Sequence, residues 1–182
     1  MMFCIWITGL PGSGKSTIAR NVKKSLADMG REILILQLDE IRKYITPEPR
    51  YTDEERDVVY RSLGYMAKLL VSTDCKDVII DATGNRRTYR DTARALILEF
   101  AEVYIQCPLE VCQEREASRV DGLVEGNLYQ KAREGRLKGG VPGITAAYEE
   151  SENPEVVIHS DVLSPVESAE EIVSYVRSRW LR

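Results

Sequence analysis

The stretch GLPGSGKST, residues 9–17, places three glycines ahead of a lysine and two hydroxyl side chains. Gly9, Gly14, Lys15 and Ser16 fit the pattern G-x-x-x-x-G-K-[ST] of a phosphate-binding loop. Glycines let the backbone curl until successive N–H groups surround an anion, and a helix that starts at the loop directs its positive end at the same anion. We therefore expect this loop to hold the phosphates of ATP or GTP, with Lys15 at the outer phosphates and the Ser16 hydroxyl on Mg²⁺. The residues expected at the phosphates are Gly9, Leu10, Pro11, Gly12, Ser13, Gly14, Lys15, Ser16 and Thr17.

Short apolar runs rich in β-forming residues alternate with amphipathic stretches on both sides of this motif. The runs predict buried strands at residues 3–8, 33–38, 78–81, 103–106 and 156–159. Helical spacing of apolar residues predicts helices after the loop, after Thr52 and after Ser164, and the last two residues are suited to cap a helix. This alternation is typical of an α/β fold, in which a parallel sheet lies between two layers of helices. We expect one domain over residues 1–182, with its ligand beyond the carboxyl ends of the strands.

The overall composition limits the class of protein. Hydrophobic residues make up 43% of the 182 residues and charged residues 30%, an ordinary balance for a globular protein. The net charge of −4 argues against a protein that coats nucleic acid. The four cysteines form no C-x-x-C pair and His159 is the single histidine, which disfavours a zinc site. The apolar N-terminus is too short to span a membrane, so we expect a cytoplasmic protein with reduced cysteines and no membrane partner.

The motif alone serves several kinds of protein, and the rest of the chain separates them. Residues 81–84, DATG, fit the D-x-x-G pattern of GTPase switches, but no guanine-reading N-K-x-D motif follows. A motor ATPase is disfavoured by the small size of the chain. A small chain with this loop is more typically an enzyme that passes the terminal phosphoryl group to a second small molecule.

Two carboxylates are placed to serve such a transfer. We predict that Asp39 ends the second strand and Asp81 the third, which would direct both side chains toward the loop. We assign Asp39 the role of general base for the acceptor hydroxyl, and Asp81 a role in holding Mg²⁺ through water. The alternative is that either residue only caps the helix that follows it. Arg42, three residues after Asp39, could bind an anionic group of the acceptor.

A basic, glycine-rich segment in the second half of the chain suggests a lid. Residues 115–140 hold six basic and four acidic side chains, in a chain that is acidic overall. We predict a lid at about residues 115–145 that closes over the phosphates and excludes water, the alternative being an exposed surface loop.

Longer segments of the chain resemble the adenylylsulfate (APS) kinases, a family with the P-loop nucleotide kinase fold. LDEIR at 38–42 is similar to the end of their D-G-D-N-[VI]-R segment, and residues 51–70 to their F-S-x-x-D-R-x-x-N helix. VYIQCPLEVCQER, LYQKAREGRLKG and AYEESENPEVVI also resemble family segments, so that the similarity spans nearly the whole chain. The resemblance implies ATP-dependent phosphorylation of the 3′-hydroxyl of adenosine 5′-phosphosulfate, which yields the activated sulfate donor.

The resemblance also implies roles for individual residues. It makes Asp39 the catalytic base and places Arg115 on the ATP side. Lys15, which the loop motif places at the outer phosphates, is the second residue expected to act in catalysis. It places Arg42, Tyr51, Arg56 and Lys138 at the acceptor, and it implies a homodimer. The cofactors would be ATP and Mg²⁺, and the partner a small nucleotide acceptor rather than a nucleic acid.

The departures from the family pattern lie mostly on the acceptor side. Val59 stands where the family has asparagine, Gln37 replaces the first aspartate of D-G-D, and residues 83–87 read TGNRR instead of I-S-P-Y-R. The run 138–144, KGGVPGI, lacks the aromatic of the family's K-G-F-T-G-I, which would stack on the acceptor base. An extra stretch at about residues 117–127 enlarges the expected lid.

Two other functions remain open from the sequence. The same scaffold could phosphorylate another hydroxyl acceptor, such as a different nucleotide-linked anion, a polynucleotide 5′ end or a seryl-tRNA. A nucleotide-binding switch without turnover is the third possibility, which the missing guanine motif disfavours.

Overall fold

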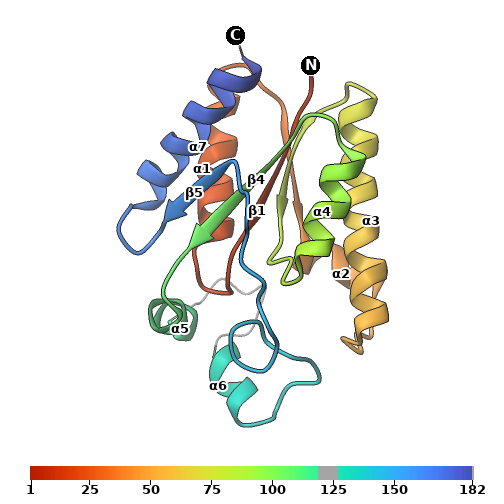
Figure 1. Ribbon diagram of the computed structural model, residues 1–182, viewed down its shortest axis with the longest axis vertical. Coiled ribbons are helices and arrows are strands. Elements are labelled where there is room, and N and C mark those ends of the chain that lie inside the picture. The colour runs from red at the N-terminus through yellow and green to blue at the C-terminus, as the bar shows by residue number, and fades with distance from the viewer. Residues whose placement is uncertain (119–126, 182) are drawn as a thin grey trace.

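The computed structural model describes residues 1–118 and 127–181, and within these ranges the chain forms a parallel sheet of five strands with helices on both faces (Figure 1). The strand order is β2-β3-β1-β4-β5, and every pairing is parallel. The strands are β1 (Cys4–Thr8), β2 (Ile33–Gln37), β3 (Asp77–Asp81), β4 (Phe100–Gln106) and β5 (Val156–His159). The helices are α1 (Lys15–Ala27), α2 (Leu38–Ile45), α3 (Asp53–Ser72), α4 (Arg87–Leu96), α5 (Leu109–Ala117), α6 (Leu128–Arg133) and α7 (Pro165–Trp180). The predicted α/β class is confirmed.

The two faces of the sheet carry separate cores because successive side chains of a strand point to opposite faces. On β1, Ile5 and Ile7 pack against α1 and α7, whereas Cys4 and Trp6 pack against α3 and α4. Figure 1 shows the same division, with α1 and α7 covering one face and α3 and α4 the other. The central strand is therefore buried throughout, and it fixes the position of the loop that follows it.

Helix ends are set by the side chains that the sequence predicts. The Ser164 hydroxyl accepts a hydrogen bond from Glu167 N, and the Glu167 carboxylate accepts one from Ser164 N, so that a complete capping box starts α7. At α3 only half of the box forms: Thr52 accepts from Glu55 N, but the Glu55 carboxylate accepts instead from the backbone N–H groups of Arg50 and Tyr51.

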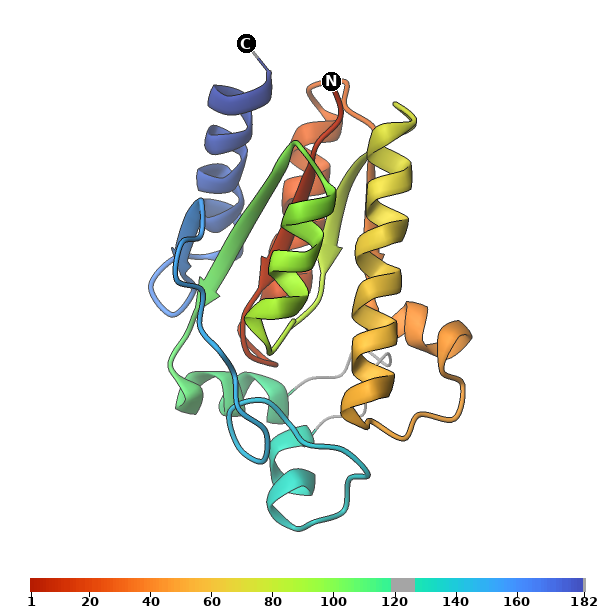
Figure 2. The same cartoon turned by 45° about the vertical axis from the view of Figure 1, so that its right-hand side comes forward.

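The carboxyl ends of the strands meet at one end of the molecule, where α2, α5 and α6 also lie (Figure 2). Both chain termini lie at the opposite end (Figure 1). A third, smaller apolar cluster forms beyond the sheet around Cys107, Cys112, Tyr129, Ala132 and Val141. Among the described residues no helix is both long and apolar enough to cross a membrane.

Candidate active site

The loop at residues 9–17 adopts the curled conformation that its glycines permit. Gly9, Gly12 and Gly14 all have positive φ, at 148°, 80° and 95°. Gly14 is the N-cap of α1, so the helix begins at Lys15 with its N-terminus beside the loop. The Lys15 ammonium group donates hydrogen bonds to the carbonyl oxygens of Gly9 (2.9 Å) and Leu10 (2.8 Å). The lysine thus lies folded over the loop, with its charge on the side where phosphates would bind.

Gly12 brings the loop into contact with α5. A Cβ atom at this residue would stand 2.2 Å from the carbonyl oxygen of Cys112, in a backbone conformation that side chains rarely adopt. On the other side of the loop, the Ser160 hydroxyl donates to the carbonyl oxygen of Ser13 (2.8 Å), and Arg115 donates to the carbonyl oxygen of Ser160 (2.8 Å). The loop is therefore held between α5 and the end of β5.

One cavity of about 780 Å³ lies in front of the loop. Its walls come from the loop, α2, the start of α3, the end of β3, α5, residues 137–142 and the segment after β5. The side chains that the sequence assigned to the reaction all line it: Lys15, Ser16, Asp39, Arg42, Tyr51, Arg56, Asp81, Arg115 and Lys138. The first two residues of the loop, Gly9 and Leu10, do not line the cavity, and Gly9 packs against Ile105.

Asp81 is a buried carboxylate at the end of β3, as predicted, and it is 5% exposed. Burial raises its pKa, while the Lys15 ammonium and the Ser16 hydroxyl act in the opposite direction. These two partners place Asp81 at the start of α1, beside the loop. A hydroxyl and a carboxylate fit Mg²⁺, which commonly takes only one or two protein ligands and completes its shell with phosphate oxygens and water. No group of three or more acidic, cysteine or histidine side chains within residues 1–118 and 127–181 could form an all-protein metal site.

The predicted position of Asp39 at the end of a strand is wrong. The strand β2 ends at Gln37, and Asp39 lies in the first turn of α2, where it is exposed to the cavity. Leu38 is buried and draws the chain into the helix, and a carboxylate is favoured near the positive end of a helix. Neither Asp39 nor Asp81 caps the next helix, since Gln37 and Arg86 are the caps of α2 and α4.

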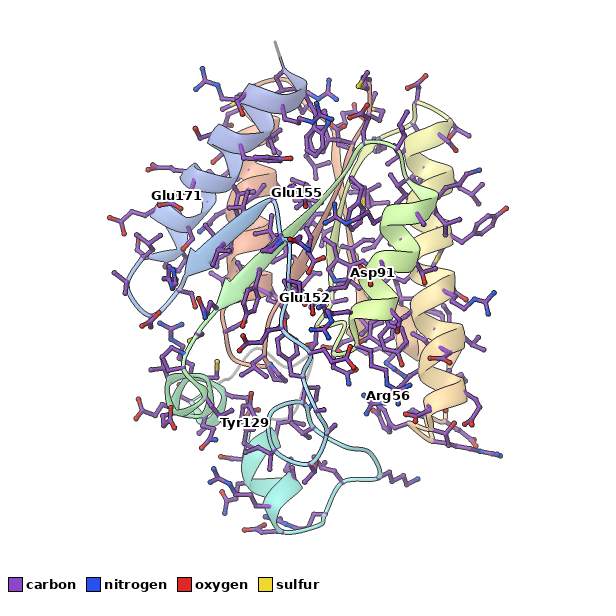
Figure 3. All side chains as sticks on the ribbon, in the orientation of Figure 1. Arg56, Asp91, Tyr129, Glu152, Glu155 and Glu171 are labelled. Atoms are coloured by element: carbon purple, nitrogen blue, oxygen red, sulfur yellow. The ribbon has the colours of Figure 1, made fainter. Side chains whose placement is uncertain are left out.

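Two arginines line the part of the cavity that α2 and α3 form. Arg42 donates to the Glu55 carboxylate at 3.3 Å, and its guanidinium lies 5.3 Å from the centre of the Tyr51 ring. Arg56 donates to the carbonyl oxygen of Gly140 at 2.8 Å and reaches the side-chain oxygen of Asn85 at 3.5 Å. Figure 3 shows Arg56 near the N-terminal end of α3. Arg61, the next arginine of α3, is exposed and does not line the cavity.

The run 138–144, which lacks the aromatic residue of the family, contains two glycines whose backbone lies against neighbouring residues. A Cβ atom at Gly139 would stand 2.5 Å from the Cβ atom of Tyr51, so this glycine lets the backbone lie flat against the tyrosine. At Gly140 a Cβ atom would stand 2.9 Å from that of Ala146. Tyr51, which precedes α3 and lies outside the lid, lines the cavity beside this glycine-rich run.

The segment that replaces I-S-P-Y-R is held by polar contacts to distant parts of the chain. The Asn85 side chain donates to the carbonyl oxygen of Ala147 (3.0 Å), and Arg86 pairs with Asp53 at 2.6 Å. Backbone N–H of Arg87 donates to the Glu149 carboxylate (2.7 Å). The segment thus connects the start of α3 to the chain beyond the lid.

The described part of the predicted lid consists of the end of α5, α6 and residues 134–145, and it packs with the rest of α5 in the small apolar cluster beyond the sheet. The Tyr129 hydroxyl of α6 donates to the carbonyl oxygen of Pro11 (2.7 Å), which ties α6 to the phosphate loop (Figure 3). Of the extra stretch at about 117–127, residues 119–126 lie outside the described residues.

Several residues of the site were not identified from the sequence. Ser160 follows β5 directly, and the rule that ligands bind beyond strand ends could have found it. Tyr60 lines the cavity four residues after Arg56, on the same face of α3. Glu116 is 2% exposed, lines the cavity and makes no hydrogen bond within the described residues, and no sequence pattern pointed to it.

The family model for adenylylsulphate kinase matches residues 1–159. The chain belongs to the adenylylsulphate kinase family. The adenylyl-sulfate kinase of Halothermothrix orenii is 36% identical over 175 residues, covering 96% of this chain and 89% of that protein. The adenylyl-sulfate kinase of Thermodesulfovibrio yellowstonii is 37% identical over 179 residues, covering 97% and 84%. The match therefore includes the loop, both carboxylates and the acceptor-side arginines.

Solved structures of the adenylylsulphate kinase family agree with the fold. The APS kinase CysC of Mycobacterium tuberculosis, in complex with AMPPNP and APS, superposes with a TM-score of 0.85 at 28% identity over 97% of this chain and 98% of that one. A gluconokinase from Sinorhizobium meliloti, at 20% identity and a TM-score of 0.62, shares the fold alone.

Proposed function

We propose that the chain transfers the terminal phosphoryl group of ATP to the 3′-hydroxyl of adenosine 5′-phosphosulfate, giving 3′-phosphoadenylyl sulfate. The observation that carries this function is a single cavity that joins the phosphate loop at Lys15 to the arginine pair Arg42 and Arg56, with Asp39 at its edge. A donor nucleotide and an anionic acceptor can therefore share one enclosure. Family membership supports the choice of acceptor, and the M. tuberculosis relative was solved with a nucleotide analogue and APS together.

On the donor side, we assign the phosphates to the backbone of residues 9–17 and to Lys15. The lysine exchanges its bonds to the Gly9 and Leu10 carbonyl oxygens for bonds to the phosphates, which costs little because one set of charged hydrogen bonds replaces another. Ser16 and Asp81 would hold Mg²⁺, which neutralises charge on the transferred phosphoryl group when it is bound. Arg115 covers the donor nucleotide from α5.

On the acceptor side, Asp39 accepts the proton of the attacking hydroxyl as a general base. Its exposed position in the first turn of α2 leaves the carboxylate free to approach an acceptor oxygen. Arg42, Arg56 and Lys138 bind the anionic groups of the acceptor, and Tyr51 supplies a ring for its base. The Arg42–Glu55 and Arg56–Gly140 bonds keep both guanidinium groups in the cavity before the acceptor arrives.

Residues 115–145 act as the lid. The bond from Tyr129 to Pro11 and the bond from Arg56 to Gly140 link this segment to the donor and acceptor sides, which supports closure over both substrates. The cytoplasmic location stays a prediction from the sequence.

We also propose that the chain forms a homodimer. Val58, Tyr65 and Leu69 lie on one face of α3 and are 58%, 53% and 41% exposed, an apolar stripe that a second copy would cover. Light scattering tests this: a dimer mass that changes to a monomer mass in the Tyr65→Glu variant is expected, and a monomeric wild-type protein contradicts it.

The first test of the function is ADP release with Mg-ATP, with and without micromolar adenosine 5′-phosphosulfate, with the product identified by mass. Release that depends on the acceptor, together with a 3′-phosphorylated product, is expected. A protein that binds ATP but shows no stimulation would contradict the assignment. The polynucleotide 5′ end and seryl-tRNA would then be the next acceptors to test.

A further inference from the structure

Tyr60 is a buried side chain of α3 that forms part of the cavity wall. The residue is 4% exposed and lines the cavity on the acceptor side. Its ring is stacked on Tyr89, with centroids 4.2 Å apart and planes 14° apart, and it also stacks on Trp6 at 6.1 Å. The ring is held on both sides, so the position of the hydroxyl is fixed.

The hydroxyl has an unused proton. Its oxygen accepts a hydrogen bond from the backbone N–H of Gly84 at 3.2 Å. Within the described residues, the Gly84 N–H group is the one hydrogen-bond partner of the Tyr60 hydroxyl. This bond occupies a lone pair of the hydroxyl oxygen and leaves its proton available. A buried O–H group normally finds an acceptor, so the cavity side of this hydroxyl is set up to donate to a ligand.

The charges around the hydroxyl favour an anionic ligand. Burial raises the pKa of Tyr60, and the Asp39 carboxylate acts in the same direction, while the charges of Arg42 and Arg56 oppose it. The hydroxyl therefore lies within the field of both acceptor-side arginines and stays protonated at neutral pH. Arg56 and Tyr60 are one helical turn apart on α3, and both line the cavity.

We infer that the Tyr60 hydroxyl donates a hydrogen bond to the anionic group of the acceptor, beside Arg42 and Arg56. The inference rests on the proposed function, because it names a further residue that selects the acceptor. Val59, where the resemblance expects an asparagine, is fully buried and cannot supply this bond. In this chain Tyr60, which follows Val59 on α3, thus supplies the uncharged hydrogen-bond donor of the acceptor site.

The variant Tyr60→Phe tests this inference because it removes the hydroxyl and keeps the ring stack. Inhibition or binding constants are measured for adenosine 5′-phosphosulfate, for adenosine 5′-monophosphate and for adenosine, which carries no anion. We expect binding of the two anionic ligands to weaken by about 10- to 100-fold, the usual loss for a hydrogen bond to a charged group. Adenosine binding and the KM for ATP should stay unchanged.

Tyr89→Phe is the matched control. It removes a hydroxyl from the neighbouring ring of the same stack, and Tyr89 does not line the cavity. Unchanged binding of adenosine 5′-phosphosulfate in Tyr60→Phe would overturn the inference. Equal weakening of all three ligands would also overturn it, because this would show that the hydroxyl only supports the backbone at Gly84. An equal loss in Tyr89→Phe would do the same.

The test separates this inference from the proposed function. If the wild-type protein shows no phosphoryl transfer to adenosine 5′-phosphosulfate, the proposed function fails. If the wild-type protein transfers phosphoryl normally and Tyr60→Phe binds the acceptor equally well, only the role of Tyr60 fails.

Discussion

Asp81 is a residue whose burial opposes stability. Its carboxylate is buried at the end of β3, and burial raises its pKa. A raised carboxyl pKa means that the folded state binds a proton more tightly than the unfolded state. The ionised carboxylate therefore lowers the free energy of unfolding. This loss is absent at pH values below the unfolded pKa of about 3.9, grows as the pH rises above that value, and is complete once the pH exceeds the folded pKa.

We therefore expect Asp81→Asn to raise the Tm of the ligand-free protein at pH 7, with the gain over the wild type shrinking as the pH falls toward about 4. The same change should weaken phosphoryl transfer and raise the Mg²⁺ concentration that half-maximal activity needs. Thermal unfolding across pH and a Mg²⁺ titration measure the two effects. A lower Tm at pH 7 would contradict the assigned cost of burial.

Asp39 carries the proposed proton transfer, so Asp39→Ala should lower kcat by about 10²- to 10⁴-fold, the usual contribution of a general base. ATP binding, measured by calorimetry, should remain, because the loop does not use this side chain. Glu40→Ala is the control, since Glu40 is the next residue of α2 and does not line the cavity. Transfer at a near wild-type rate in Asp39→Ala would exclude the general-base role.

At the scale of elements, the two capped helices have different links to the site. The helix α7 packs against α1, and its cap Ser164 does not line the cavity. Pro165 and Ser168 of α7 do line it, but α7 carries none of the residues that we assign to the acceptor. The helix α3 begins at Asp53, and its cap Thr52 lies between Tyr51 and Arg56, which we assign to the acceptor. Loss of a cap should therefore affect stability alone in the first case, and both stability and acceptor binding in the second.

Ser164→Ala and Thr52→Ala form a matched pair for this difference. Each should lower the free energy of unfolding by about 1 kcal/mol. The acceptor KM should rise in Thr52→Ala and stay constant in Ser164→Ala. Chemical denaturation and steady-state kinetics on the same samples measure both quantities. A change in acceptor KM in Ser164→Ala would show that α7 influences the site.

Elements with a regular pattern could be predicted from the sequence, and those dominated by charge could not. The five strands and the helices α1, α3 and α7 were predicted within a few residues. The start of β4 was not predicted because Glu102 interrupts the apolar run of this strand. In the structure, Glu102 is paired with Arg90 of α4. The helix α4 has three arginines and few apolar residues, so it was not predicted, although Tyr89 and Ala93 lie on one face of the helix.

The same limit holds for the site. The loop motif located the residues expected at the phosphates, spacing located Arg42, and the family resemblance located Arg56 and Arg115. Asp39 was assigned to the cavity correctly but to the wrong element, because Gln37-Leu38 continues the apolar strand pattern into the helix. Tyr60 and Ser160 depend on the arrangement of α3 and β5 around the cavity, and a linear pattern does not encode that arrangement.

At the scale of the whole molecule, Arg90 connects parts that are far apart in the chain. It is fully buried on α4 and pairs with Glu102 of β4 at 2.8 Å. It also donates to the carbonyl oxygens of Gly84 and Glu149, at the segment after β3 and the chain beyond the lid. Its guanidinium group thus holds the acceptor-side wall to the sheet.

Glu102→Gln should lower the free energy of unfolding by about 3–5 kcal/mol, because it leaves the Arg90 charge buried without its partner. Equilibrium denaturation measures the loss. Glu32→Gln is the control, since the Lys76–Glu32 pair is exposed and its removal should leave the denaturation midpoint unchanged. An equal effect in both variants would argue against a special role of the buried pair.

The contact between Gly12 and α5 restricts the residue types that position 12 can accept during evolution. The motif leaves position 12 open, yet the Cys112 carbonyl oxygen occupies the space of any Cβ there. Gly30 has a similar backbone conformation, with φ 77°, but nothing lies within 4 Å of a Cβ. A randomised library selected for activity should therefore return asparagine as well as glycine at position 30, and glycine alone at position 12. A side chain at position 12 would require the backbone of α5 to shift, so we expect the loop and α5 to change together in evolution.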